Sequence, residues 1–286
     1  MKAPPDAPAF LSALRNDDPA VTVELRPPRA DLSRGDRLDV WIDTYHTVGR
    51  LTRAGRFVFL TDNAVGADEE ENLAHLEGNF PDEADPAHVV PFLTAKHSLS
   101  YCLTYAQRAW ARGVRSMAVL GGDRTVGPPR CVPHAYLLRQ LIRERVPNLV
   151  LGGWANPHRD AAEQAGYLTA PDSTADFFLT QVVSHHSAGR VEALLRELGR
   201  RGSEAPAVFG VFFYRSGNPE TLARLGDFFP VPAAELGAEF AGGATSEEVC
   251  ARSLRALRDA GARNVYVSNL PVRTASRTLE AVLANV

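Results

Sequence analysis

The chain has 286 residues, of which 45% are hydrophobic and 23% charged, and its formal net charge is −3. This composition is ordinary for a globular protein. The weak negative charge excludes a general electrostatic surface for nucleic acid or for an anionic membrane. The length fits two average domains or one α/β barrel, which often has about 250 residues.

The cysteines and the N-terminus bear on the compartment. Three cysteines are widely spaced and form neither a metal-finger nor a redox motif, which favours a reducing environment. Residues 1–10 contain three prolines and no sustained apolar run, so we expect neither a signal peptide nor a membrane span. We therefore predict a cytoplasmic protein whose residues 1–18 form a loosely held arm.

Apolar runs followed by helical patterns recur along the rest of the chain. The expected strands are 20–25, 57–60, 89–93, one within 115–124, 149–151, 176–183, 207–214 and 264–270. The expected helices are 36–53, 68–76, 99–111, 132–145, 158–165, 187–200, 218–225, 244–260 and 272–284. Ser98 is the expected N-cap of the helix over 99–111.

The order of these elements predicts the fold class. The strand runs are continuous rather than alternating, which is typical of parallel strands covered on both faces. Eight strands, each followed by helical sequence and joined by short connections, predict a single (β/α)8 TIM barrel over 19–286. The alternative is an open doubly wound sheet, but no Gly-x-Gly-x-x-Gly follows the first strand.

Polar residues follow almost every expected strand. A barrel gathers the carboxyl ends of its strands on one face, so these residues should surround a single pocket. They are Glu24, Thr61, Asp62, Asn63, Thr94, Lys96, His97, Asp123, Asn156, His158, Gln181, Tyr214 and Asn269. The sequence therefore predicts a polar site that combines carboxylates, an amide and imidazoles.

Several of these residues also have a purely structural interpretation. Glu24 could form an ion pair with Arg26 or Arg29 at the rim. Asp123 could cap the turn that follows two glycines. Gln181 could be a buried amide that is hydrogen-bonded within the core. The local sequence leaves both readings open for each residue.

The histidines do not suggest a metal centre. His185 and His186 are adjacent, and neighbouring side chains on a regular element point in different directions. His97 and His158 have no partner at metal-ligand spacing. We therefore predict no metal site. The sequence also contains neither a nucleophile elbow nor a P-loop.

Six short motifs stand in order along the chain. They are Val-Glu-Leu-Arg-Pro-Pro-Arg at 23–29, Leu-Thr-Asp-Asn at 60–63, Leu-Gly-Gly-Asp at 120–123, Ala-Asn-Pro at 155–157, Ala-Asp-Phe-Phe-Leu-Thr-Gln at 175–181 and Phe-Pro-Val-Pro at 229–232. Through these motifs the chain resembles the methylenetetrahydrofolate reductases of the short bacterial type, over about 21–282. These are flavin-dependent barrels of folate one-carbon metabolism.

The resemblance implies a reaction and roles for particular residues. The reaction is reduction of 5,10-methylenetetrahydrofolate to 5-methyltetrahydrofolate, with hydride passing from NAD(P)H through FAD. Glu24 is implied as the general acid, and Asp123 and Gln181 as ligands of the pterin ring, with Tyr214 as a further substrate contact. The implied cofactor-binding residues are Thr61, Asp62, Asn63, Gly121, Gly122, Asn156 and His158.

One departure from the family and two alternative functions accompany this reading. The segment 159–175 is short and acidic where the family carries a basic cluster for the flavin phosphate. A folate-binding methyl- or formaldehyde-transferase would keep the pterin site without hydride chemistry. A non-catalytic subunit of a one-carbon complex would keep the barrel alone. The expected partner is a small-molecule folate, and a homo-oligomer stays open.

Overall fold

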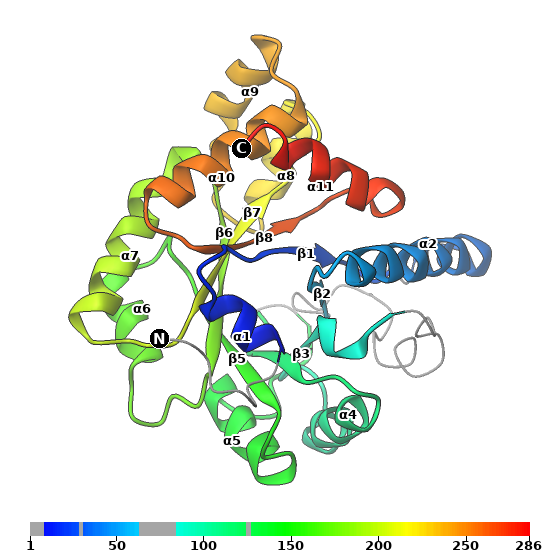
Figure 1. Cartoon of the computed structure of the whole chain (residues 1–286), viewed down its shortest axis with the longest axis vertical. Coiled ribbons are helices and arrows are strands. Elements are labelled where there is room, and N and C mark those ends of the chain that lie inside the picture. The colour runs from blue at the N-terminus through cyan, green and yellow to red at the C-terminus, as the bar shows by residue number, and fades with distance from the viewer. Residues whose placement is uncertain (1–8, 29–30, 63–83, 124–126) are drawn as a thin grey trace.

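A computed structural model describes residues 9–28, 31–62, 84–123 and 127–286. Eight parallel strands form a closed barrel in sequence order, and β1 pairs with both β2 and β8. Helices surround this barrel (Figure 1). The predicted (β/α)8 TIM barrel is confirmed. Asn63 and the expected helix over 68–76 lie outside the described residues.

The strands lie close to their expected positions. They are β1 (Val21–Leu25), β2 (Val58–Leu60), β3 (Val89–Thr94), β4 (Ser116–Leu120), β5 (Val150–Ala155), β6 (Phe177–Val183), β7 (Ala207–Phe212) and β8 (Asn264–Ser268). In β2, β3, β4 and β8 every residue is buried, which explains the continuous apolar runs.

Helices lie in most of the described connections between strands, and α1 precedes β1. They are α1 (Ala9–Arg15), α2 (Arg34–Arg53), α4 (Leu99–Ala111), α5 (Ala135–Arg145), α6 (Ala161–Leu168), α7 (Ala188–Arg200), α8 (Pro219–Gly226), α9 (Ala233–Ala241), α10 (Ser246–Asp259) and α11 (Ala275–Leu283). Short 3₁₀ turns are η1 (Pro86–His88), η2 (His185–Ser187) and η3 (Val272–Thr274). Among the described helices, none combines the length and apolarity needed to cross a membrane.

Aromatic rings from different strands meet in the barrel interior. The Phe59 ring centroid lies 5.6 Å from that of Phe92 and 5.5 Å from that of Tyr266. Gly210 in β7 makes room for this packing, because a Cβ there would lie 2.5 Å from atoms of the Tyr266 ring and hydroxyl. The interior is therefore a packed core whose rings depend on a glycine in a neighbouring strand.

The N-terminal segment is partly packed rather than loosely held. The α1 side chains Phe10 and Leu14 are 0% and 2% exposed. The Phe10 ring makes edge contacts with Phe57 and Phe177, at centroid distances of 4.9 and 5.0 Å. The expectation of a loose arm is wrong for residues 9–15, because this short helix buries its apolar face against the barrel.

Strand β6 contains a bulge near its carboxyl end. Leu179 pairs with Val208 and Val182 pairs with Gly210, so two residues of β6 oppose one of β7. Leu179 and Val182 belong to the same core cluster although they are three positions apart. The bulge thus breaks the period-two alternation at residues 180–181, and Gln181 lies within it.

The segment after β7 carries one helix that the sequence reading missed. The expected helices over 218–225 and 244–260 correspond to α8 and α10. Between them, α9 follows Pro232, which is its N-cap and provides no side-chain cap bond. Leu236 in α9 is fully buried, so this helix is an integral part of the fold.

Candidate functional site

The carboxyl ends of the strands place most of the expected polar residues around one rim. Glu24 lies within β1 and Gln181 within β6, one or two positions before each strand ends. Asp62 and Asp123 follow the ends of β2 and β4. Because all eight strands are parallel, these residues share the carboxyl-terminal side of the barrel.

Glu24 is a buried carboxylic acid. Its residue is 7% exposed, and Oε1 accepts a hydrogen bond from Ser268 Oγ at 2.5 Å. The Arg26 Nε atom is 3.9 Å from the same oxygen, but the Arg26 side chain is 62% exposed. Burial raises the pKa of Glu24, and the Arg26 charge and the Ser268 bond only partly oppose this rise. The environment therefore favours a protonated carboxyl group.

Tyr266 extends from this acid toward the bulge of β6. Its hydroxyl donates to the Thr180 carbonyl oxygen at 2.6 Å. Burial raises the Tyr266 pKa, and the nearby charge of Glu24 raises it further. Tyr266 thus stays a neutral hydrogen-bond donor to Thr180, the residue that precedes Gln181.

Asp62 has an internal structural role in addition to its position at the rim. Its Oδ2 atom accepts hydrogen bonds from the Thr94 backbone N at 2.7 Å and from Thr94 Oγ1 at 3.0 Å. His97 Nε2 lies 2.9 Å from both carboxylate oxygens. Asp62 therefore joins β2 to the end of β3, beside the buried Thr61.

The loop after β4 is held by two basic residues. Arg130 donates to the carbonyl oxygen of Gly122, and its guanidinium lies against Gly121, where a Cβ would come within 2.8 Å. Lys96 Nζ donates to the carbonyl oxygen of Pro128 at 2.9 Å. Asp123 follows the two glycines and is exposed at the rim.

Asn156 and His158 form a turn after β5. The Asn156 side-chain oxygen accepts from the His158 backbone N at 3.0 Å. His158 Nε2 is 2.9 Å from the Val182 carbonyl oxygen, which requires a proton on that nitrogen. Burial lowers the pKa of His158, so the imidazole favours its neutral form. This turn fixes the end of β5 against the end of β6.

Gln181 and Tyr214 occupy different surroundings. The half-buried Gln181 side chain accepts from the Val182 backbone N at 2.9 Å. Tyr214 is 5% exposed, its ring centroid is 5.0 Å from that of Phe212, and burial raises its pKa. The amide of Gln181 remains next to the bulge, whereas Tyr214 packs within the aromatic core.

The structure adds partners that the sequence reading did not assign. Ser268 and Tyr266 lie on β8 and contact the acid and the bulge described above. Ser268 and Tyr266 lie near β1 only because β8 pairs with β1 and closes the barrel. Ser268, like Asn269, is a polar residue at the end of β8, so the same strand-end pattern could have identified it.

Asn269 has a left-handed backbone conformation, with φ of 68°. Its side chain donates to the Phe213 carbonyl oxygen at 3.0 Å. The Arg215 guanidinium donates to the backbone carbonyl oxygen of Asn269. Asparagine tolerates this conformation better than most residues. Asn269 therefore ties the ends of β7 and β8 together.

A cavity of about 280 Å³ lies between α4 and the connection from α5 to β5. Its lining includes Trp110 of α4 and the residues Val146–Asn148 between α5 and β5. This connection leads into a strand, so the cavity is at the amino-terminal side of the barrel and away from the polar rim.

The beginning of α6 bears on the FAD that the family resemblance implies. Asp160 is the N-cap of this helix, and its side chain accepts from the Glu163 backbone N at 2.8 Å. Two acidic groups thus surround the helix N-terminus, which would otherwise favour a phosphate. The residues at the start of α6 do not fit the phosphate of FAD.

Comparisons with known proteins agree on the barrel. The chain matches no protein-family model and no curated protein. A solved structure of an uncharacterized protein from Clostridium thermocellum, which binds two copies of 5-methyl-5,6,7,8-tetrahydrofolic acid, aligns with a TM-score of 0.69, 13% identity and 97% coverage of each chain. A candidate lyase/mutase from Burkholderia cenocepacia J2315 aligns with a TM-score of 0.51 and 15% identity over 96% of this chain and 83% of that chain. At these identities the likeness establishes the fold alone.

Proposed function

We propose that this protein binds a reduced folate at its carboxyl-terminal rim and reduces 5,10-methylenetetrahydrofolate to 5-methyltetrahydrofolate. Three observations support the proposal. The strand-end motifs resemble those of methylenetetrahydrofolate reductases, the rim carries a buried acid, and a protein of similar fold binds 5-methyltetrahydrofolate.

The observation that carries the chemistry is the buried Glu24. Burial raises its pKa and so favours the protonated form that a general acid requires. In the proposed step Glu24 protonates the bridging nitrogen of the five-membered ring. The carbon–nitrogen bond then breaks, the methylene carbon becomes part of an iminium ion, and a hydride converts it into the methyl group.

The pterin would be held by residues on two other strands. Asp123 follows β4 and Gln181 lies in β6, and their carboxylate and amide match the amino and lactam edge of a pterin. The carboxylate of Asp123 would also favour the positive charge of the iminium ion. In this arrangement the acid, the carboxylate and the amide act on one bound folate.

The hydride donor in this proposal is a reduced nicotinamide that acts directly. The acidic start of α6 disfavours the FAD phosphate, so the proposed hydride transfer does not pass through a flavin. One NAD(P)H supplies two electrons as a hydride and becomes NAD(P)⁺, while Glu24 supplies the proton and is reprotonated from solvent. These changes balance the conversion of the methylene group to a methyl group.

The experiment combines the purified full-length protein with methylenetetrahydrofolate and NADH or NADPH. We expect loss of reduced-nicotinamide absorbance, formation of 5-methyltetrahydrofolate, and no increase in rate on addition of FAD. An increase with FAD would overturn direct transfer but keep the reductase. Folate binding without turnover under every condition would favour the transferase, and absence of folate binding would favour the non-catalytic subunit.

A further inference from the structure

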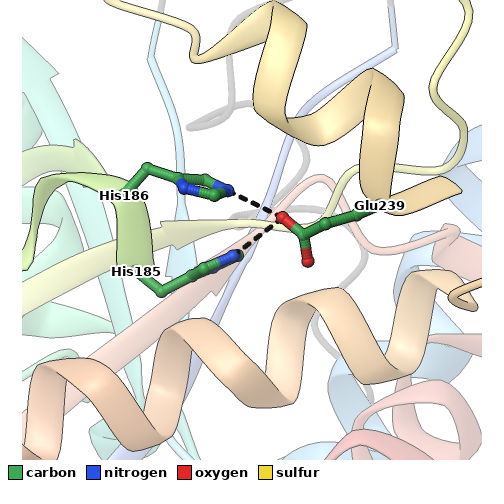
Figure 2. Close-up of side chains that lie close together, drawn as sticks. All are labelled: His185, His186 and Glu239. Carbon is green, nitrogen blue, oxygen red and sulfur yellow. Dashed lines mark hydrogen bonds and ion pairs between the residues drawn. The ribbon is translucent and has the colours of Figure 1, made fainter. Parts of the chain in front are cut away.

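Two imidazoles and a carboxylate converge beside the rim. His185 and His186 lie in η2, directly after β6, and their Nε2 atoms are 2.8 and 2.7 Å from Oε1 of Glu239 in α9 (Figure 2). The three potential ligand atoms all lie within 4.8 Å of one another. The expectation that the two rings diverge is wrong, because they belong to a 3₁₀ turn and their centroids are 3.9 Å apart.

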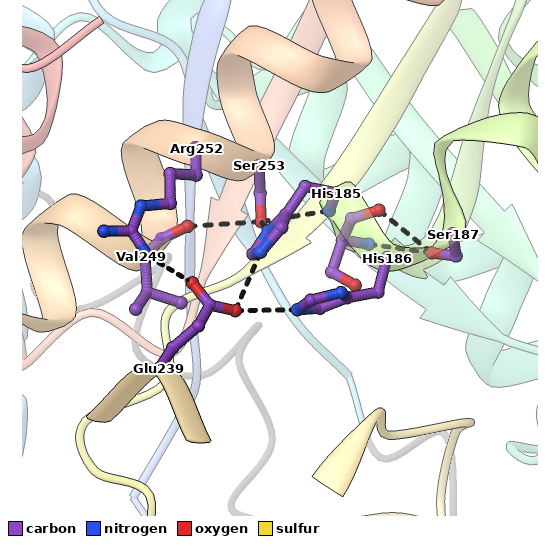
Figure 3. Close-up of polar contacts among 8 residues, drawn as sticks. His185, His186, Ser187, Glu239, Val249, Arg252 and Ser253 are labelled. Carbon is purple, nitrogen blue, oxygen red and sulfur yellow. Dashed lines mark hydrogen bonds and ion pairs between the residues drawn. The ribbon is translucent and has the colours of Figure 1, made fainter. Parts of the chain in front are cut away.

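Outer contacts orient this cluster (Figure 3). His185 Nδ1 is 2.9 Å from Ser253 Oγ, which lies 3.3 Å from the Val249 carbonyl oxygen. In a metal-bound form, a proton on Nδ1 and the serine proton would satisfy this chain in series and leave the Nε2 lone pair of His185 available to the metal ion. Arg252 donates to Glu239 Oε2 at 2.6 Å and so directs Oε1 toward both rings.

Contacts of the same kind surround the ligands of metal centres. In such centres the outer ring nitrogen of a ligating histidine donates to an oxygen, and the ligating carboxylate is itself hydrogen-bonded. Without a metal ion, the 2.8 and 2.7 Å contacts between the two Nε2 atoms and Glu239 Oε1 are hydrogen bonds. A cation bound between these three atoms would take the place of the shared protons.

We propose that His185, His186 and Glu239 bind a divalent transition-metal ion, with Zn²⁺ as the best match. Two imidazole nitrogens and one carboxylate oxygen form a known zinc ligand set with an open fourth position. The side chains are 17%, 25% and 14% exposed, so the site is sheltered but accessible from solvent. This proposal is independent of the folate reaction.

The ion-free distances fit the proposal after a small adjustment. Tetrahedral ligands about 2.0–2.1 Å from zinc lie about 3.3 Å from one another, so the rings would retreat from the carboxylate by about half an ångström. His186, the more exposed of the two, can move toward solvent. The ion would then connect the turn after β6 with α9, and through Arg252 and Ser253 with α10.

The competing interpretation is a proton-sharing cluster that only fastens α9 to η2. A titration of chelator-treated full-length protein with a Zn²⁺ salt separates the two. We expect one ion per chain, and Co²⁺ should give the visible absorption of a tetrahedral site. His186→Gln and Glu239→Gln should each weaken Zn²⁺ binding by more than about 100-fold, and Ser253→Ala by about 10- to 100-fold.

A matched control is available in the same chain. His88 Nδ1 is 2.8 Å from Asp85 Oδ2, which reproduces one histidine–carboxylate pair of the cluster. His88→Gln should leave Zn²⁺ affinity unchanged, and circular dichroism should show that every variant is folded. The proposal is overturned if folded His186→Gln binds Zn²⁺ as tightly as the wild type, or if the wild type binds no ion.

Discussion

Two glutamates near the same rim have opposite surroundings. Glu24 in β1 is 7% exposed and meets a serine hydroxyl and a distant, exposed guanidinium, so burial raises its pKa. Burial also acts to raise the pKa of Glu239 in α9, but hydrogen bonds from His186, Arg252 and His185 outweigh it, and the pKa is lowered. One site favours a neutral acid and the other an anion.

This difference shows how a barrel can separate two chemistries within one face. Hydrogen-bond donors that carry positive charge stabilise a carboxylate, whereas a dry pocket with a neutral donor favours the protonated group. Glu24 therefore suits proton donation, and Glu239 suits binding of a cation. The following experiments test this contrast, beginning with the largest expected effect.

The first test removes the acidic proton. Glu24→Gln should lower kcat for methylenetetrahydrofolate reduction by about 10²- to 10⁴-fold, the usual contribution of a general acid. Folate binding, measured by calorimetry, should change little because the amide keeps the size of the side chain. Turnover at the wild-type rate would exclude Glu24 from the mechanism.

The second test compares the stability of the same substitution at both glutamates. In metal-free protein, Glu239→Gln should lower the free energy of unfolding by about 1.5–3 kcal/mol, because hydrogen bonds to charged groups are lost. For Glu24→Gln, the difference in unfolding free energy between variant and wild type should shift in favour of the variant as the pH rises from about 5 to about 8. Denaturant unfolding at the two pH values provides the measurement.

The sign of this pH effect follows from the raised pKa of Glu24. Its folded-state pKa lies above the pKa of a glutamate in the unfolded chain, so the contribution of the protonated group to stability is fully present below that unfolded-state pKa. This contribution is lost as the pH rises through the folded-state pKa. The glutamine variant cannot ionise at this position, so its stability does not fall in this way. An equal pH dependence of stability in both proteins would contradict a raised pKa of Glu24.

The third test disturbs the packing of Tyr266, whose pKa the charge of Glu24 helps to raise. Gly210→Ala places a Cβ 2.5 Å from Tyr266 atoms and should lower the free energy of unfolding by about 1–3 kcal/mol through overpacking. Gly189→Ala in α7 is the control, because no heavy atom lies within 4 Å of its added Cβ. Equal unfolding midpoints for the two variants would argue against a tight contact at Gly210.

The smallest expected effect concerns the hydrogen bond to Glu24. Ser268→Ala removes a donor that lowers the Glu24 pKa, so the fall in kcat at high pH should move to a higher pH. The maximal rate should change by less than about tenfold, because one such bond contributes about 0.5–1.5 kcal/mol. A shift of the profile to lower pH would contradict the predicted role of Ser268.

The strand framework could be predicted because burial on both faces leaves a clear pattern. Val58–Leu60 and Ser116–Leu120 are buried throughout, and their apolar runs end where polar residues begin. The position of Glu24 at a strand end followed from the same pattern. Its partner Ser268 did not, because 244 positions separate the two residues and only barrel closure joins them.

The helix α9 and the histidine cluster were missed for related reasons. Ala233–Ala241 is a short helix after a proline-containing segment, and its buried Leu236 gives little periodic signal. The convergence of His185 and His186 depends on η2 and on Glu239, more than 50 positions away. The packed positions of Phe10 and Leu14 could not be predicted either, because a helix of seven residues carries a weak apolar pattern.

The bulge in β6 has a consequence for evolutionary comparison. The extra residue lies between Leu179 and Val182. If β6 were aligned without a gap to the corresponding strand of a barrel that lacks this residue, every residue after the bulge would be displaced by one position. Gln181 and the histidine pair would then be matched with unrelated columns. A single-residue gap at 180–181 keeps homologous positions together, so divergent barrels that lack the extra residue remain comparable with this one.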